Sequence, residues 1–305
     1  MKPTTLLTLF TTGASAATLP VKQAPTLPRD ASQLRLLHTL TPSAPPGGAR
    51  LLAASTESTK GGAILTLPEK DNQISSVQAT IRVPLAEPPT RGPTANNPVG
   101  VYAASFWVGI DSALSPGSDP SCPGSLRAGV DIFYDGTLGG PQTPFAWYQF
   151  APEKGSVTGF ADFAVAAGDL VRFTAQAGGS TSSGDVTVVA ENFGNVTCVN
   201  GAQPVKTARQ TWPAGGEGQK LCGREAAWVV EDFPLAGMPQ FPVALANFTT
   251  VTFGAAGVTL AGGEKRDVTG AGVTDVRQQR QGGRLTSCEV VEGKKVKCSR
   301  VVGDN

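Results

Sequence analysis

Glycine and proline recur along the whole chain and leave little room for a long helix. The 305 residues include 37 Gly and 24 Pro, and both residue types cost free energy inside a helix. Short runs rich in Val, Thr and Ala stand between them, which is the pattern of strands bounded by turns. Apolar residues make up 40% of the chain, enough for a sizeable core. The sequence therefore predicts an all-β protein.

The expected strands follow one another after residue 60, separated by turn residues. They are 62–67, 74–83, 103–111, 126–134, 145–150, 170–177, 185–192, 226–233 and 243–253, followed by a closing hairpin between Cys288 and Cys298. This spacing predicts one large antiparallel sandwich in a single domain, residues 54–305.

Charge and composition exclude several classes of function. A formal net charge of +1 argues against a nucleic-acid partner, and no apolar run approaches the ~18 residues of a membrane span. The one histidine, His38, lies in a segment that we expect to be removed. A chain without it has no Ser-His-Asp, Cys-His or His-ligated zinc site, and we expect neither a metal nor a cofactor.

Residues 1–16 have the features of a secretory signal peptide: Lys2, a short apolar stretch at 6–10 and the small residues 14–16. The alternative, an N-terminal strand, is disfavoured by Pro3. Residues 17–53 are basic and rich in proline, so they cannot form a core of their own. This second segment is either a disordered linker or a pro-segment whose cations cover an acidic surface until it is removed.

Secretion would carry the five cysteines into an oxidising compartment. They are Cys122, Cys198, Cys222, Cys288 and Cys298. The last two flank a short hairpin with an expected turn at Gly293, so we expect a bridge across it. The first and third could join distant strands, which leaves Cys198 free or buried. Asn195 and Asn247 begin glycosylation sequons in a secreted chain.

Alternation within the expected strands sorts side chains onto faces. Polar or charged residues share a face with Gly or an aromatic residue in two strands, namely Arg127 and Asp131 with Gly129, and Gln149 with Trp147. In a third strand, Glu231 shares a face with Val229. Such a face is typical either of a ligand cleft across a sheet or of a solvated outer surface.

Four segments of the chain resemble segments of the fungal glutamic peptidases, the eqolisin or G1 family, in their order and approximate spacing. They are 107–111 (WVGID), 128–131 (AGVD), 146–148 (AWY) and 226–233 (AAWVVEDF). Residues 57–65 resemble the start of the mature enzymes. The cysteines other than Cys198 also fall where related chains place theirs. The resemblance covers about residues 57–300 and implies a secreted zymogen with a signal peptide and a basic pro-segment.

The resemblance implies a concanavalin A-like sandwich of two bent antiparallel sheets with a cleft on the concave face. It also implies an acid endopeptidase in which a Glu and a Gln hold one water. The carboxylate takes a proton as the water attacks the peptide carbonyl and then gives it to the leaving amine. The Gln amide orients the water and donates to the oxyanion. We expect a monomer that binds a polypeptide.

Residue by residue, Glu231 matches the catalytic Glu of the family, whereas Arg127 stands at the position of the catalytic Gln. The expected cleft and substrate-binding residues are Lys60, Trp107, Asp111, Asp131, Trp147 and Gln149. Lys60 replaces a Trp, Gln149 replaces a Glu, and Ala227 replaces a further Glu.

Arg127 changes the expected chemistry because a guanidinium donates hydrogen bonds but accepts none. It can stabilise an oxyanion but cannot accept a bond from the attacking water. An alternative function is therefore an inactive secreted homologue that binds peptides or acidic ligands in the same cleft. A third alternative, a lectin or glucanase, rests on the sandwich fold alone.

Overall fold

The computed structural model describes residues 57–68, 73–89, 100–111, 124–151, 157–178, 184–213, 220–233 and 243–302. The expected signal peptide (1–16), the pro-segment (17–53) and Cys122 lie outside these residues and stay predictions.

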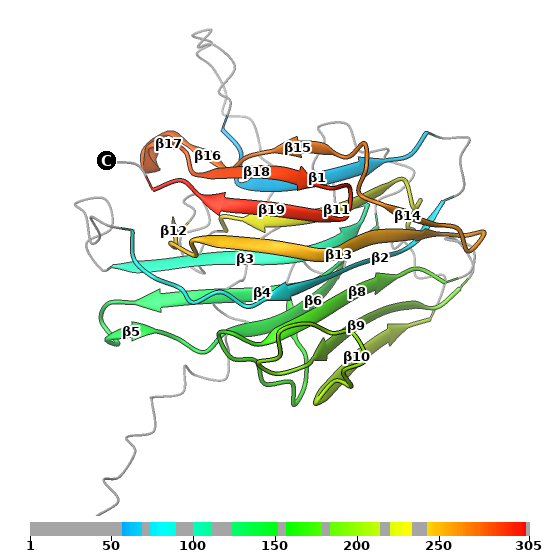
Figure 1. Ribbon diagram of the computed structural model, residues 1–305, viewed down its shortest axis with the longest axis horizontal. Coiled ribbons are helices and arrows are strands. Elements are labelled where there is room, and N and C mark those ends of the chain that lie inside the picture. Colours follow the sequence, from blue (N-terminus) through cyan, green and yellow to red (C-terminus); the bar gives the residue numbers. More distant parts are fainter. Residues whose placement is uncertain are drawn as a thin grey trace, which may run out of the picture.

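The described residues form strands and one short 3-10 helix (Figure 1). In chain order they are β1 (Lys60–Thr66), β2 (Ile74–Arg82), β3 (Val101–Ile110), β4 (Ser125–Asp135), β5 (Gly140–Pro141), β6 (Phe145–Ala151), β7 (Thr158–Gly159), β8 (Leu170–Gln176), β9 (Val186–Asn192), β10 (Lys206–Trp212), β11 (Glu225–Glu231), β12 (Ala244–Leu245), β13 (Thr250–Leu260), β14 (Lys265–Asp267), β15 (Gly272–Thr274), β16 (Arg277–Gln278), η1 (Gln279–Gln281), β17 (Gly283–Arg284), β18 (Thr286–Val291) and β19 (Lys295–Arg300).

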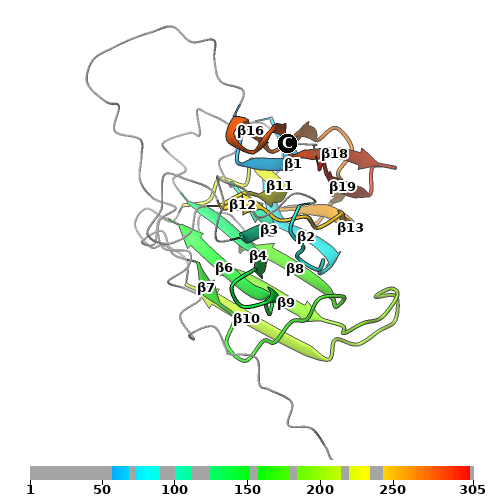
Figure 2. The ribbon, with the colours of Figure 1, turned by 90° about the vertical axis from the view of Figure 1, so that its left-hand side faces the viewer.

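Two large sheets lie one over the other, as Figure 2 shows from the side. The first is nine-stranded, with the order β15-β1-β11-β3-β4-β6-β7 and with β12 and β5 attached to β3 and β4. The second is eight-stranded, with the order β10-β9-β8-β2-β13-β19-β18 and with β14 attached to β13. The predicted all-β sandwich is confirmed.

The hydrophobic core fills the space between the two sheets. Alternate residues of β3, such as Phe106 and Val108, are buried in it. Trp228 of β11 shows how the sheets meet, because its indole Nε1 donates to the backbone oxygen of Gln78 on β2 at 3.0 Å. Side chains of opposite parity on these strands therefore face away from the core, and this second side of the nine-stranded sheet is called the outer face below.

Eight of the expected strands agree with the structure to within two residues at each end. The expected strand 243–253 is wrong, because it is divided between β12 and β13, with Thr249 at φ 54° between them. The sequence analysis did not predict β10. This edge strand consists mostly of exposed polar residues, so its sequence lacks a clear alternation of apolar and polar side chains.

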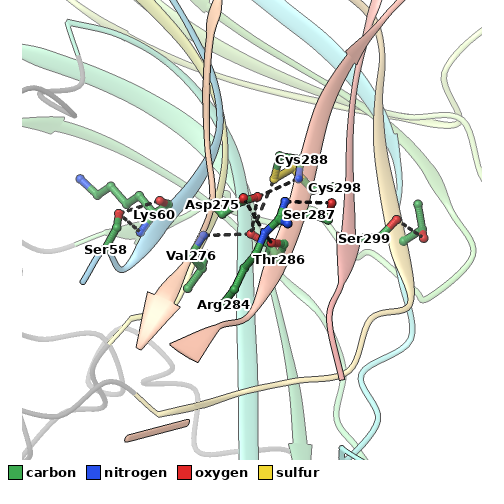
Figure 3. The surroundings of a disulfide bond; sticks show 11 residues. Ser58, Lys60, Asp275, Val276, Arg284, Thr286, Ser287, Cys288, Cys298 and Ser299 are labelled. Carbon is green, nitrogen blue, oxygen red and sulfur yellow. Dashed lines mark hydrogen bonds and ion pairs between the residues drawn. A yellow bond between two sulfur atoms is a disulfide. The ribbon is translucent and has the colours of Figure 1, made fainter. Parts of the chain in front are cut away.

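The disulfide expected across the closing hairpin is confirmed. Cys288 of β18 and Cys298 of β19 are directly opposite in the register, and their sulfurs are bonded. Figure 3 shows Asp275 beside this bond, with its carboxylate accepting hydrogen bonds from the backbone N–H of Cys288 and from Arg284. Cys198 is free and exposed. Cys222 is disulfide-bonded.

The two expected glycosylation sites differ in their surroundings. Asn195 is exposed, and its side-chain oxygen accepts a hydrogen bond from Arg82 at 3.1 Å. Asn247 is half-buried, and its side-chain oxygen accepts from the backbone N–H of Thr249 at 3.0 Å. Modification at either asparagine stays a prediction.

Candidate functional site

Three transverse rows of residues cross the outer face where β1, β11, β3, β4 and β6 lie side by side. The first row is Lys60, Glu231, Ser105, Asp131 and Phe145. The second is Gly62, Val229, Trp107, Gly129 and Trp147, and the third is Ile64, Ala227, Gly109, Arg127 and Gln149. The register thus brings the expected Glu231 and Arg127 to the same face, on strands separated by β3.

Glu231 is buried on this face, with 1% of its surface exposed. The indole Nε1 of Trp107, one strand away on β3, donates to Glu231 Oε2 at 2.7 Å. Trp107 is itself fully buried. The side chain of Trp107 therefore fixes one oxygen of the carboxylate in place.

Two cations contact the ring of the same tryptophan. The Arg127 guanidinium carbon lies 4.8 Å from the ring centroid of Trp107, and Lys60 Nζ lies 5.8 Å from it. Both distances are within the range of cation–π attraction. Trp107 thus contacts the carboxylate through its N–H edge and both cations through its ring. We call these four residues the Trp107 cluster.

Two glycines give the Trp107 cluster the space that it needs. A Cβ atom at Gly129 would lie 2.5 Å from Trp107 Cβ and 2.3 Å from the backbone oxygen of Phe106. A Cβ atom at Gly109 would lie 3.1 Å from Arg127 Cγ and 3.2 Å from Trp107 Cζ3. Glycine inside a strand is the signal that points to such a close approach, although the role of Gly109 was missed in the sequence.

A second tryptophan–carboxylate pair lies beside the first. Trp147 Nε1 donates to Asp131 Oδ1 at 2.7 Å, and Asp131 is 1% exposed. Gln149 is also buried and stands opposite Arg127 in the register. The expected cleft residues Asp131, Trp147 and Gln149 therefore share the outer face with the Trp107 cluster.

Asp111 is placed differently from the other expected cleft residues. One carboxylate oxygen accepts the backbone N–H groups of Cys222 and Gly223, at 2.6 and 2.7 Å, and the other accepts those of Arg224 and Glu225, at 2.9 and 3.2 Å. These contacts support a role in holding the chain at the start of β11. A contact between Asp111 and substrate stays a prediction.

Replacing Asp111 by Ala is expected to lower the free energy of unfolding by about 1.5–3 kcal/mol, because four backbone N–H groups lose a charged acceptor. Urea unfolding of the variant and the wild type measures this. Asp185→Ala, at an exposed position, is the control. A loss below about 0.5 kcal/mol, the usual effect of a surface substitution, would contradict this role for Asp111.

The described residues contain no group of three or more His, Cys, Asp or Glu side chains arranged to hold a metal ion. No helix among them is long and apolar enough to cross a membrane.

Comparisons with known proteins show the family of the chain and its fold. The model of the Peptidase A4 family matches residues 58–300. The crystal structure of scytalido-glutamic peptidase with a transition state analog inhibitor is similar to the chain, with a TM-score of 0.57 and 26% identity over 80% of this chain and 99% of that one. The structure of SCP-B, a member of the eqolisin family of peptidases, in a complex with the tripeptide Ala-Ile-His is also similar to the chain. Its TM-score is 0.56, and its sequence identity is 25% over 80% of this chain and 99% of that one. Among curated proteins, none matches significantly.

Proposed function

Because the chain belongs to the Peptidase A4 family, whose model matches residues 58–300, we propose that it is a secreted acid endopeptidase of the glutamic type. In this proposal Glu231 is the general acid and base, and Arg127 takes the place of the second catalytic side chain. The observation that carries it is the Trp107 cluster, in which one indole binds the buried carboxylate and stacks with the guanidinium.

Each group has a defined step in the proposed reaction. The Glu231 carboxylate takes a proton from a water molecule as the water oxygen attacks the peptide carbonyl carbon. The carbonyl oxygen becomes an oxyanion, to which the Arg127 guanidinium donates hydrogen bonds. Glu231 then gives its proton to the leaving nitrogen as the carbon–nitrogen bond breaks. No covalent intermediate and no histidine is needed.

Acidic conditions suit this pair of side chains. An arginine guanidinium stays charged and keeps its donors at every pH at which the protein folds, so acid does not remove the oxyanion partner. A histidine in the same place would be permanently protonated in acid. The absence of histidine from the residues after His38 is consistent with such chemistry.

The proposed substrate is a polypeptide that binds across the outer face. SCP-B was solved with a bound tripeptide, which supports a peptide ligand for this chain. Lys60, Trp147 and Gln149 are the side chains that we expect to contact it beside the Trp107 cluster. We also propose that the chain is secreted as a zymogen. The hairpin disulfide supports secretion, because such bonds persist in oxidising compartments.

A second candidate function is favoured by the charges of the Trp107 cluster. Lys60 and Arg127 are both half-buried cations, so an inactive homologue could bind acidic peptides at the same place. Its signature would be salt-sensitive binding of an acidic peptide that weakens in an Arg127→Gln variant and is accompanied by no cleavage.

Digestion of an acid-denatured protein at about pH 2–5, the acid range in which the proposed endopeptidase would work, tests the proposed activity. The expected result is cleavage that resists pepstatin, an inhibitor of aspartic peptidases. Equal cleavage by the wild type and by a Glu231→Gln variant would contradict the proposed mechanism.

A further inference from the structure

The residue after the proposed catalytic carboxylate is a second buried acid, and the proposed reaction does not use it. Asp232 follows β11 directly and is 0% exposed. Its backbone N–H donates to the backbone oxygen of Thr59 at 2.7 Å. Gln281 Nε2 donates to Asp232 Oδ2 at 2.8 Å, whereas Oδ1 is buried without a hydrogen-bond partner. One side-chain hydrogen bond does not compensate for the hydration free energy that an ionised carboxylate loses on burial.

Gln281 connects Asp232 to three other segments of the chain. The Gln281 side-chain oxygen accepts the backbone N–H of Leu245 in β12 at 2.8 Å. The backbone oxygen of Leu245 in turn accepts from Arg300 Nη2 at 3.4 Å, and Arg300 Nη1 donates to the backbone oxygen of Leu285 at 3.1 Å. This network joins the end of β11 to β12, η1 and the end of β19.

Two charged side chains act on Asp232 in the described part of the chain: Arg300 from β19, and Glu231 from its own strand. Burial raises the pKa of Asp232 well above its usual range, and the Glu231 carboxylate raises it further. The hydrogen bond from Gln281 and the charge of Arg300 act in the opposite direction but are outweighed. Burial also lowers the pKa of Arg300, to about 10, so this cation is itself poorly solvated.

We propose that Asp232 is a positioning residue that works as an acid latch: its protonated form ties the end of β11, which carries Glu231, to β12, η1 and β19. Ionisation of this buried carboxyl, as the pH rises toward neutrality, leaves a charged group with one unpartnered oxygen in the core and so destabilises this junction. The positioning of Glu231 rests on the proposed function, whereas the effect on stability does not.

The direction of the pH effect follows from linkage. A carboxyl group whose pKa is raised by folding binds its proton more tightly in the folded chain than in the unfolded chain. Its contribution to stability is complete below the unfolded pKa, 3.8 for Asp. It is lost as the pH rises from there through the folded pKa. Over this interval one such group increases the unfolding equilibrium constant by about tenfold for each pH unit.

Asp232→Asn tests the latch in the full-length chain. The amide keeps the shape and can still accept the bond from Gln281, but it cannot ionise. Urea unfolding between about pH 4 and 6 should show a smaller rise in the unfolding constant than in the wild type, with a difference that approaches about tenfold for each pH unit below the folded pKa of Asp232. Asp185→Asn, which removes an exposed carboxyl, should follow the wild type. Equal pH dependence in Asp232→Asn and the wild type would overturn the proposal.

A measurement on the wild type covers the case in which the variant does not fold. In a chain labelled with ¹³C at the aspartate carboxyl groups, one resonance should titrate well above the usual range of about 3–5. Titration of every aspartate within that range would overturn the proposal.

Peptide hydrolysis separates the latch from the proposed function. We expect Asp232→Asn to keep the wild-type kcat near pH 4 and to extend activity to higher pH. A wild type without hydrolysis would remove the proposed function but leave the stability result to decide on the latch. Matched activity profiles that fall at the same pH would remove the positioning of Glu231.

Discussion

Replacing Glu231 by Gln is expected to lower kcat for peptide hydrolysis by about 100- to 10,000-fold, the usual contribution of a positioned general acid–base group. The reason is specific to proton transfer, because the amide oxygen of Gln can still accept the hydrogen bond that Trp107 donates at 2.7 Å. The variant should therefore fold and bind peptide as the wild type does. Initial rates in acid, at saturating peptide, measure the change.

Glu191→Gln is the matched control for this prediction. Glu191 lies on β9 in the other sheet, where it forms a partly exposed ion pair with Arg172 at 3.2 Å. Such pairs contribute little to stability, so this variant should keep wild-type activity. A Glu231→Gln variant with undiminished kcat would show that another group moves the proton.

Replacing Arg127 by Gln is expected to raise kcat by about 100-fold, the order of effect of one well-placed polar group in a hydrolytic site. A guanidinium can only donate, whereas a carboxamide can accept a hydrogen bond from the attacking water and also donate to the oxyanion. The loss of a cation that stacks 4.8 Å from the Trp107 centroid also removes positive charge from the surroundings of Glu231. The double variant Arg127→Gln, Lys60→Trp should also have a higher kcat than the wild type.

Arg172→Gln, on β8, controls for the loss of an arginine elsewhere in the sandwich and should leave kcat unchanged. Increased hydrolysis in Arg127→Gln would identify an eroded peptidase site in the natural chain. A fall in hydrolysis would contradict the prediction, because it would show that a carboxamide at position 127 cannot replace the guanidinium as the oxyanion partner. Binding of an acidic peptide, measured in parallel at two salt concentrations, separates either outcome from the binding-only alternative.

The three positions differ in the kind of change expected of them. Glu231 and Arg127 are proposed to touch the reacting atoms, so their variants should change kcat at a single acidic pH. Asp232 faces away from them into a buried network, so its variant should change the dependence on pH. Measuring all three variants over the same pH range distinguishes chemistry from positioning.

Local pattern in the sequence was enough to predict the strands and the faces of their side chains. Period-two alternation predicts that Glu231 and Val229 share a face whatever the neighbouring strands are, and the register agrees. The hairpin disulfide was also predictable, because the short segment between Cys288 and Cys298 brings the two cysteines together without any distant contact. By contrast, the prediction of one strand over 243–253 was wrong, since the strand breaks at Thr249, a residue type that is itself common in strands.

The partners of Glu231 were decided by tertiary structure alone. Lys60 stands opposite Glu231 only because β1 pairs with β11, and Arg127 reaches Trp107 only because β3 lies between β11 and β4. The link from Asp232 to Gln281 and Arg300 needs the end of one sheet to meet residues attached to the other. Strand order depends on which distant segments pair, and no short-range pattern encodes that choice. Residue types and faces are therefore properties of the sequence, whereas the contacts that would make them a catalytic site arise from long-range pairing of strands.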